Sequence, residues 1–394
     1  MVIHRGIATF GLDYGKFPRW LFERMVRLGR QILAVMNEEY GPDEFIKRIA
    51  DPGWFQSLGT VLAFDWNASG LTTILTAALK EAVRSQERDF GIFICGGKGK
   101  TSLKTPDEIQ NWGEVLSLPE PQTSNLVYNS KMAAKVDSSL VQDGFQLYHH
   151  AFFFSRNGSW SIVQQGMNQQ NLTARRYHWY SKNITDLVVE PHSGIASLSR
   201  PQRRDQTLAP TLNLTAKESK PTQKLSTEMV QGNYCGLMKD IQILRRHYSD
   251  FSQSLKLRQG GQTLTLLNLE NREFSWHPVV TENFGKSKYL EKILYKVCET
   301  KPENYERLVS LEGVGPKTVR ALSLVSEVIY GAKPSYQDPA RYSFAHGGKD
   351  ATPYPIDRPT YDSTISFFQK IINELKIPLS EKRKLENRLV GVVN

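Results

Sequence analysis

Apolar residues recur every three or four positions in the first part of the chain, which is the spacing of one helical face. This pattern predicts helices over about residues 18–32, 42–49 and 69–84, the first of them opening with Pro18. The sequence Asp51-Pro52-Gly53 breaks the periodicity between the second and third helices. We therefore expect the chain to begin with several short helices.

Short apolar runs rich in aromatic and β-branched residues follow, and this pattern predicts strands. Residues 90–95 (FGIFIC) have the composition of a buried strand, which ends in the glycine-rich segment GGKGKTS at 96–102. A hairpin is expected over 145–165, because Asn157-Gly158 has the chemistry of a type I′ turn. Residues 1–196 are thus predicted to form a mixed α/β domain.

The composition changes between residues 197 and 227, where Ser, Thr, Pro, Gln and basic residues replace large apolar ones. We expect a polar linker or a long loop in this segment. Beyond it the apolar pattern is mainly helical, with two helices joined by a short glycine-containing turn at about 306–329. The predicted fold is a mixed α/β N-terminal domain (1–196) joined to a mainly α C-terminal domain (228–394).

The composition is that of a globular protein with an excess of basic residues. The 394 residues include 50 Lys and Arg and 40 Asp and Glu, which gives a formal net charge of +10 and favours a polyanionic partner. No stretch of about 18 apolar residues occurs, so no membrane span is expected. Cys95, Cys235 and Cys298 form neither a CxxC metal site nor a disulfide framework, which favours a reduced, cytoplasmic protein.

The most specific motif is LEGVGPKT at 311–318, between two predicted helices. Its glycines allow a phosphate to approach backbone N–H groups, and the start of the second helix adds positive potential. The stretch 306–329 resembles the helix-hairpin-helix motif of DNA-repair and recombination proteins. This resemblance implies contacts with the phosphate backbone of DNA from Gly313, Gly315, Lys317, Thr318 and Arg320. A tight turn between two packed helices is the alternative interpretation of the same glycines.

Within this motif class, the helix-hairpin-helix DNA glycosylases use a hairpin lysine as nucleophile and an aspartate further along the chain. The resemblance assigns these roles to Lys317 and to Asp338, 21 residues later. A lysine that attacks a sugar carbon forms a Schiff base, the chemistry of a bifunctional glycosylase/lyase. A lysine at this position is also common in hairpins that only bind phosphate, so both interpretations stay open.

Two further basic segments are candidate nucleic-acid contacts. Lys98 and Lys100 lie in the glycine-rich segment, where backbone N–H groups add to the phosphate-binding potential. This segment lacks the first glycine of a P-loop, so an ATPase is not expected. Arg175 and Arg176 stand beside Tyr177, a combination of cationic and stacking groups that is typical of single-stranded nucleic-acid surfaces.

A metal-dependent nuclease is a second catalytic hypothesis, and it requires carboxylates around a divalent ion, usually Mg²⁺. Asp143, His149 and His178 are the candidate catalytic residues, but no short spacing unites the acids of the chain into a known ligand set. A zinc site from His149 or His150 with His178 and His192 is an alternative, although none of these histidines shows i, i+4 pairing. Strand alternation places His149 and His150 on opposite faces of the sheet. Other available acids and histidines are Asp65, Asp137, Glu190 and His192. A hydrogen-bonded structural role is the alternative for each histidine.

Several long stretches outside the polar segment are distinctive, among them PRWLFERMVRLGRQI (18–32), DPGWFQSLGTVLAFDW (51–66), SKMAAKVDSS (130–139), QDGFQLYHHAFFF (142–154), ARRYHWYS (174–181) and DPARYSFAHGGKD (338–350). Together they resemble an uncharacterised bacterial and archaeal family, domain of unknown function 763. The resemblance covers nearly the whole chain but implies no activity.

The leading hypothesis from the sequence is a DNA-binding protein that processes or repairs DNA, by glycosylase/lyase chemistry or by metal-dependent cleavage. The competing hypothesis is a non-catalytic module that binds DNA or RNA, since nothing in the sequence reads a 2′-hydroxyl. No cofactor is assigned, apart from Mg²⁺ if the protein is a nuclease. The oligomeric state is left open.

Overall fold

Six antiparallel strands form the central sheet in the N-terminal half of the chain. In the computed structural model their order is β1-β6-β5-β4-β2, and β7 pairs with β6 along the same edge as β1. The strands are β1 (Phe10–Gly11), β2 (Ile92–Lys98), β4 (Gln146–Ser155), β5 (Trp160–Asn168), β6 (Thr173–Tyr180) and β7 (His192–Ser197). The structure describes residues 10–11, 17–62, 70–169, 172–197, 211–246, 255–259, 262–266, 288–340 and 358–390.

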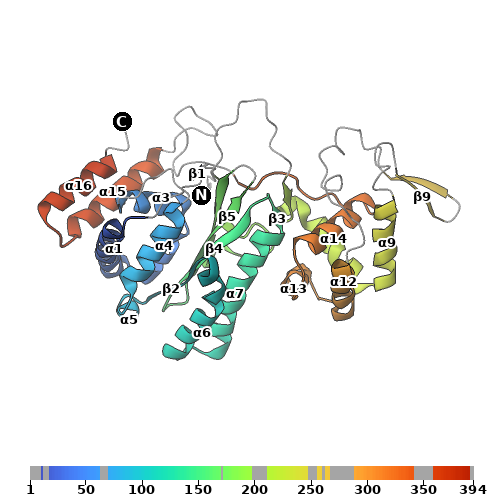
Figure 1. Cartoon of the computed structure of the whole chain (residues 1–394), viewed down its shortest axis with the longest axis horizontal. Coiled ribbons are helices and arrows are strands. Elements are labelled where there is room, and N and C mark those ends of the chain that lie inside the picture. Colours follow the sequence, from blue (N-terminus) through green and yellow to red (C-terminus); the bar gives the residue numbers. More distant parts are fainter. Residues whose placement is uncertain are drawn as a thin grey trace.

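Helices cover both faces of this sheet, which explains why its strands are apolar at consecutive positions. The helices of the N-terminal half are α1 (Arg19–Tyr40), α2 (Pro42–Ile49), α3 (Pro52–Val61), α4 (Gly70–Val83), α5 (Glu87–Phe90), α6 (Thr105–Val115) and α7 (Glu120–Ser139). Phe153 and Val163 join the core beneath α1–α4, whereas Phe152 and Ile162 join the core beneath α6 and α7. Figure 1 shows α1 and α4 on one side of the strands and α7 on the other.

The C-terminal part is mainly helical, and its helices pack against the N-terminal half in two separate places. Its elements are β8 (Leu212–Asn213), α8 (Lys220–Gln231), α9 (Tyr234–Arg246), β9 (Leu255–Gln259), β10 (Gln262–Leu266), α12 (Lys288–Thr300), α13 (Tyr305–Ser310), α14 (Pro316–Val328), α15 (Arg358–Glu374) and α16 (Leu379–Val390). Helices α8, α9 and α12–α14 share the core of α6 and α7. Helices α15 and α16 lie at the opposite end of the molecule, where Phe368 stacks on Trp54 at 5.5 Å.

These observations confirm a mixed α/β N-terminal half followed by helices. The hairpin at 145–165 is present as β4 and β5, but its turn type differs from the expected one. Only Gly158 of the Asn157-Gly158 pair has a positive φ, +88°, so the turn is not type I′, which needs a positive φ at both residues.

The expected polar linker also differs from the structure. Residues 198–210 lie outside the described residues, but the rest of the segment is ordered secondary structure. β8 pairs with β3 (Val141–Gln142), and α8 buries Thr222 and Ser226 against the helical core. Small polar residues in this segment form packed contacts, which composition alone does not distinguish from a solvated loop. The domain boundary at residue 228 remains a prediction. Helix α15 follows this boundary in the sequence but packs in the core of the N-terminal helices.

None of the helices in the described ranges has the length and apolar character needed to cross a lipid bilayer.

Candidate functional site

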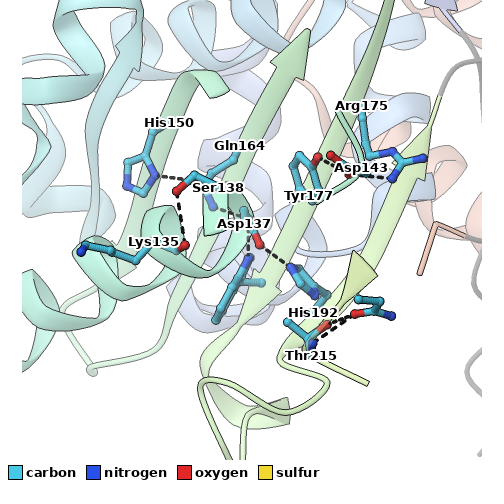
Figure 2. Close-up of polar contacts among 12 residues, drawn as sticks. Lys135, Asp137, Ser138, Asp143, His150, Gln164, Arg175, Tyr177, His192 and Thr215 are labelled. Atoms are coloured by element: carbon cyan, nitrogen blue, oxygen red, sulfur yellow. Dashed lines mark hydrogen bonds and ion pairs between the residues drawn. The ribbon is translucent and has the colours of Figure 1, made fainter. Parts of the chain in front are cut away.

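A buried carboxylate, Asp137 of α7, organises the polar groups on one face of the sheet. Its side chain is fully buried and accepts hydrogen bonds from Gln164 Nε2 (2.5 Å), Trp179 Nε1 (3.0 Å) and His192 Nε2 (2.5 Å). Figure 2 shows the Asp137 carboxylate between Gln164 and His192. These three contacts satisfy both oxygens of the buried carboxylate. Because the Nε2 atom of His192 bonds to Asp137, Nδ1 is the ring nitrogen that remains for another partner.

From Gln164 of β5 the same network continues through β4 and returns to α7 at a second position. The Oε1 atom of Gln164 accepts from His150 Nδ1 (3.0 Å), and the Nε2 atom of His150 lies 2.9 Å from the Ser130 hydroxyl. Burial lowers the pKa of His150, which favours its neutral form. A continuous chain of buried hydrogen bonds thus connects Ser130 to His192.

A second cluster surrounds Arg175 of β6. Its guanidinium forms ion pairs with Asp143 (2.6 Å) and Asp338 (2.6 Å), and the Tyr177 hydroxyl donates to Asp143 (2.7 Å). Burial opposes the charge on Arg175, but the two carboxylates outweigh this effect and raise its pKa. Two sequence-predicted residues, Asp143 and Asp338, are therefore brought together, through an arginine that was expected on a nucleic-acid surface.

A pocket of about 120 Å³ lies beside these clusters, where three distant segments meet. Its polar walls come from the start of β7, from residues 213–218 and from residues 335–339. The backbone N–H of Asn213 donates to Ser335 O (2.9 Å), and that of Glu190 donates to Thr215 O (2.8 Å). The principal polar lining residues are Glu190, His192, Thr215, Glu218, Ser335 and Asp338.

The LEGVGPKT motif forms a tight turn between α13 and α14. Gly313 has φ +86°, and a Cβ atom there would lie 2.3 Å from Ile293 Cδ1, so the turn requires glycine. Gly315 is different, because a Cβ atom there would meet nothing within 4 Å. It is the N-cap of α14, has no side chain to cap the helix, and accepts the first helical bond from Val319 N (3.1 Å). The amides of residues 317 and 318 therefore precede the helical hydrogen-bond ladder.

Side chains of the N-terminal half hold this hairpin. Lys135 Nζ of α7 donates to Leu311 O (2.8 Å) and to Val314 O (2.5 Å), and burial lowers its pKa. Gln142 Nε2 donates to Pro316 O (3.0 Å) and its Oε1 accepts from Arg320 Nε (2.5 Å). The hairpin is thus fixed to α7 and β3 by hydrogen bonds to its backbone.

The hairpin residues predicted to contact DNA divide into two groups. Lys317 is exposed and forms no ion pair or hydrogen bond with any residue that the structure describes. Thr318 is buried, and Arg320 is half-buried against Gln142. Among the five predicted positions, Gly315 has open space at its Cβ position and Lys317 is exposed, whereas Gly313 packs against Ile293.

The other basic segments also differ from one another. Lys98 and Lys100 are exposed at the start of a short 3-10 helix, Gly99–Lys104, and the Lys98 Nζ atom lies 6.0 Å from the Tyr148 ring. Arg175 and Arg176 are buried instead, and Arg176 lies over the Phe55 ring at 4.7 Å. Burial lowers the pKa of Arg176 to about 9. The expected surface of Arg175 and Arg176 is not formed, because β6 is central in the sheet and is covered on both faces.

The candidate catalytic histidines are buried on the face toward α1–α4, away from Asp137. The Nε2 atom of His149 lies 3.2 Å from the Thr76 hydroxyl, and burial, reinforced by His150, lowers the pKa of His149 to about 3. The His178 Nδ1 atom lies 3.0 Å from Ile49 O, and burial lowers its pKa well below the usual value. Both positions match the hydrogen-bonded structural alternative. His149 and His150 face opposite sides of the sheet, as strand alternation predicts.

No group of three or more His, Cys, Asp or Glu side chains within the described ranges is arranged to hold a metal ion. Asp65, one of the acids considered for Mg²⁺, lies outside the described residues. Asp143 is engaged by Arg175 and Tyr177, so its oxygens serve an ion-pair cluster.

The pairing of Asp137 with His192 was not foreseen from the sequence. The two residues are 55 positions apart, on a helix and at the start of an edge strand. A signal was available, because Asp137 is an acid on the same face of α7 as the apolar residues Ala133 and Val136, which face the core.

No curated protein and no solved structure matches this chain. A family model described as "Protein of unknown function (DUF763)" matches residues 6–356, most of the length of the chain. The stretches that resemble this family lie largely in the sheet, in its covering helices and in the segment after α14. The chain therefore belongs to the DUF763 family of proteins of unknown function.

Proposed function

We propose that the protein binds DNA by contacts between the α13–α14 hairpin and the sugar–phosphate backbone. The observation that carries the proposal is the uncapped N-terminus of α14 beside Gly315, where no atom lies within 4 Å of the Cβ position. Free N–H groups and the helix dipole favour an anion at such a terminus. A side chain at position 315 would occupy the space that a phosphate needs.

Charge and aromatic groups around the turn support the same ligand. Lys317 is exposed in the first turn of α14, and Lys288 and Lys292 are exposed on the adjacent helix α12. Tyr289 is 65% exposed, and its hydroxyl is 3.7 Å from the Cβ position of Gly313. Lysines and backbone amides bind phosphate without reading bases, so the proposed binding is independent of sequence.

The proposal is for binding, without a lyase step at Lys317. Asp338, the residue expected to assist Lys317, accepts from Arg175 (2.6 Å) and from the Ala340 amide (2.8 Å). No hydrogen bond or ion pair joins Lys317 to Asp338 in the part of the chain that the structure describes. Borohydride trapping on abasic DNA tests the lyase step directly, and a cross-linked species would add catalysis to the proposal.

Fluorescence anisotropy with a labelled DNA duplex tests the binding itself. Gly315→Val is the informative variant, because the residue is extended at φ −147° and its Cβ has free space, so the fold should be retained. We expect a loss of affinity of about tenfold or more for Gly315→Val. For Lys317→Gln we expect the slope of log K against log salt to fall by about one.

The matched control is Lys376→Gln, an exposed lysine that follows α15 at the other end of the molecule. It should leave both affinity and salt slope unchanged. Binding by folded Gly315→Val that equals the binding of the unmodified protein would refute the proposal. A duplex of the same sequence in RNA completes the comparison, and tighter binding to it would replace DNA with RNA as the ligand.

A further inference from the structure

The pocket beside β7 has acidic walls. Glu190, Glu218 and Asp338 reach it from three segments that are far apart in the sequence, and none of its lining residues is Lys or Arg. Two of these carboxylates have a cationic partner outside the lining: Lys217 lies 3.2 Å from Glu190, and Arg175 lies 2.6 Å from Asp338. Glu218 has no ion pair with any described residue. The pocket therefore has an excess of negative charge.

A buried imidazole adds an acceptor to these walls. The His192 side chain is only 7% exposed, lines the pocket and is held by the bond from its Nε2 atom to Asp137. Its Nδ1 atom forms no hydrogen bond with the residues that the structure describes. This nitrogen is therefore available to a ligand or to water in the pocket that His192 lines. The bond to Asp137 fixes the orientation of the ring, as a buried carboxylate does for an oriented histidine.

We propose that this pocket binds a small organic cation, an ammonium or guanidinium group on a short aliphatic chain. Such a group supplies several N–H donors to the carboxylates and to His192 Nδ1, and its charge balances theirs. A metal ion fits less well, because no three of the candidate ligand side chains in the described ranges converge as a metal site requires. The pocket volume of about 120 Å³ has room for the head of such a cation.

The backbone of the wall is also adapted to the site. Glu190 adopts φ +46°, a left-handed conformation that is unfavourable for a residue with a side chain, and its N–H is held by Thr215 O. Glu190 lines the pocket, and its carboxylate lies 3.2 Å from Lys217 Nζ. The proposed site is separate from the α13–α14 hairpin and does not depend on DNA binding.

Isothermal titration calorimetry of the full chain tests the proposal with agmatine and putrescine as the cations. Urea and 1-butanol are the neutral probes of comparable groups. We expect saturable binding of at least one cation and none of the neutral probes. Failure of both cations to bind at about ten millimolar, or equal binding of urea, would overturn the proposal.

Two variants locate the binding. Glu218→Gln removes one carboxylate from an exposed position and keeps the fold, so we expect cation affinity to fall about tenfold, the effect of one charge-assisted hydrogen bond. His192→Gln should abolish binding. Glu303→Gln, an exposed glutamate before α13, is the matched control and should bind as the unmodified protein does. If His192→Gln fails to fold, the comparison of Glu218→Gln with Glu303→Gln decides alone, and equal affinities of these two variants would refute the site.

Discussion

Replacement of Arg175 by methionine tests the buried cluster that joins the sheet to the segment after α14. The variant keeps the aliphatic stem and removes the cation that Asp143 and Asp338 share. The Asp143 side chain is 1% exposed and the Asp338 side chain 18% exposed, so water cannot replace the guanidinium at Asp143. The variant therefore leaves an uncompensated buried charge.

The expected loss of unfolding free energy follows from this burial. Removal of one partner of a buried ion pair destabilises proteins by about 3–5 kcal/mol. Asp143 keeps the Tyr177 hydroxyl (2.7 Å) and the Phe145 amide (3.1 Å), which places the expected loss near the lower limit, about 3 kcal/mol. Burial already raises the pKa of Asp143 in the unmodified protein, and the loss of Arg175, whose charge lowers this pKa, should raise it further. The folded state then binds more protons, so the loss should be smaller at pH 5 than at pH 8.

Urea unfolding followed by circular dichroism measures these differences. The double variant Arg175→Met/Asp143→Asn should recover part of the lost stability, because no buried charge is left at position 143. Arg27→Met, at an exposed arginine of α1, is the control and should change stability by less than about 0.5 kcal/mol. A loss of unfolding free energy below about 1 kcal/mol for Arg175→Met would refute the stability contribution assigned to this cluster. A double variant no more stable than the single variant would refute it as well.

Three further predictions concern other contacts. The pKa of His149 is about 3 in the folded protein against an ordinary value of 6.5, so its contribution to stability should fall as the pH drops below 6.5, by about 3 kcal/mol at pH 4.5; His149→Gln should reduce this dependence in urea titrations. Gly313→Ala should lower the melting temperature because its Cβ collides with Ile293, whereas Gly315→Ala should change it little; equal effects would contradict the turn geometry. Lys135→Met leaves the Leu311 and Val314 carbonyls without their donor, so amide hydrogen exchange over 311–319 should become faster while α1–α4 keep their protection; unchanged exchange would show that Lys135 does not hold the hairpin.

Local patterns in the sequence determined the type and place of many elements. Apolar periodicity located α1, α2 and α4 but not α3 or α7, and alternation placed His149 and His150 on opposite faces of the sheet. The turn between α13 and α14 was also readable, because a GxG sequence before proline is a local signal for a turn and a helix start. Conformational preferences act within a few residues, so these features need no knowledge of distant partners.

The tertiary structure decided which polar groups meet. The ARRYHW segment combines the residue types of a nucleic-acid surface, yet β6 lies inside a sheet with helices on both faces, so Arg175 and Arg176 are buried. Arg175 finds Asp338 across 163 positions, and His192 finds Asp137 across 55. A charge is stable in the core only when the fold supplies its partner, and no local pattern names a partner so far away. The sequence by itself thus determined which residues carry charge or can bind a proton, and the packing of the sheet between its helices decided which of them face each other, which face the pocket and which remain free for a ligand.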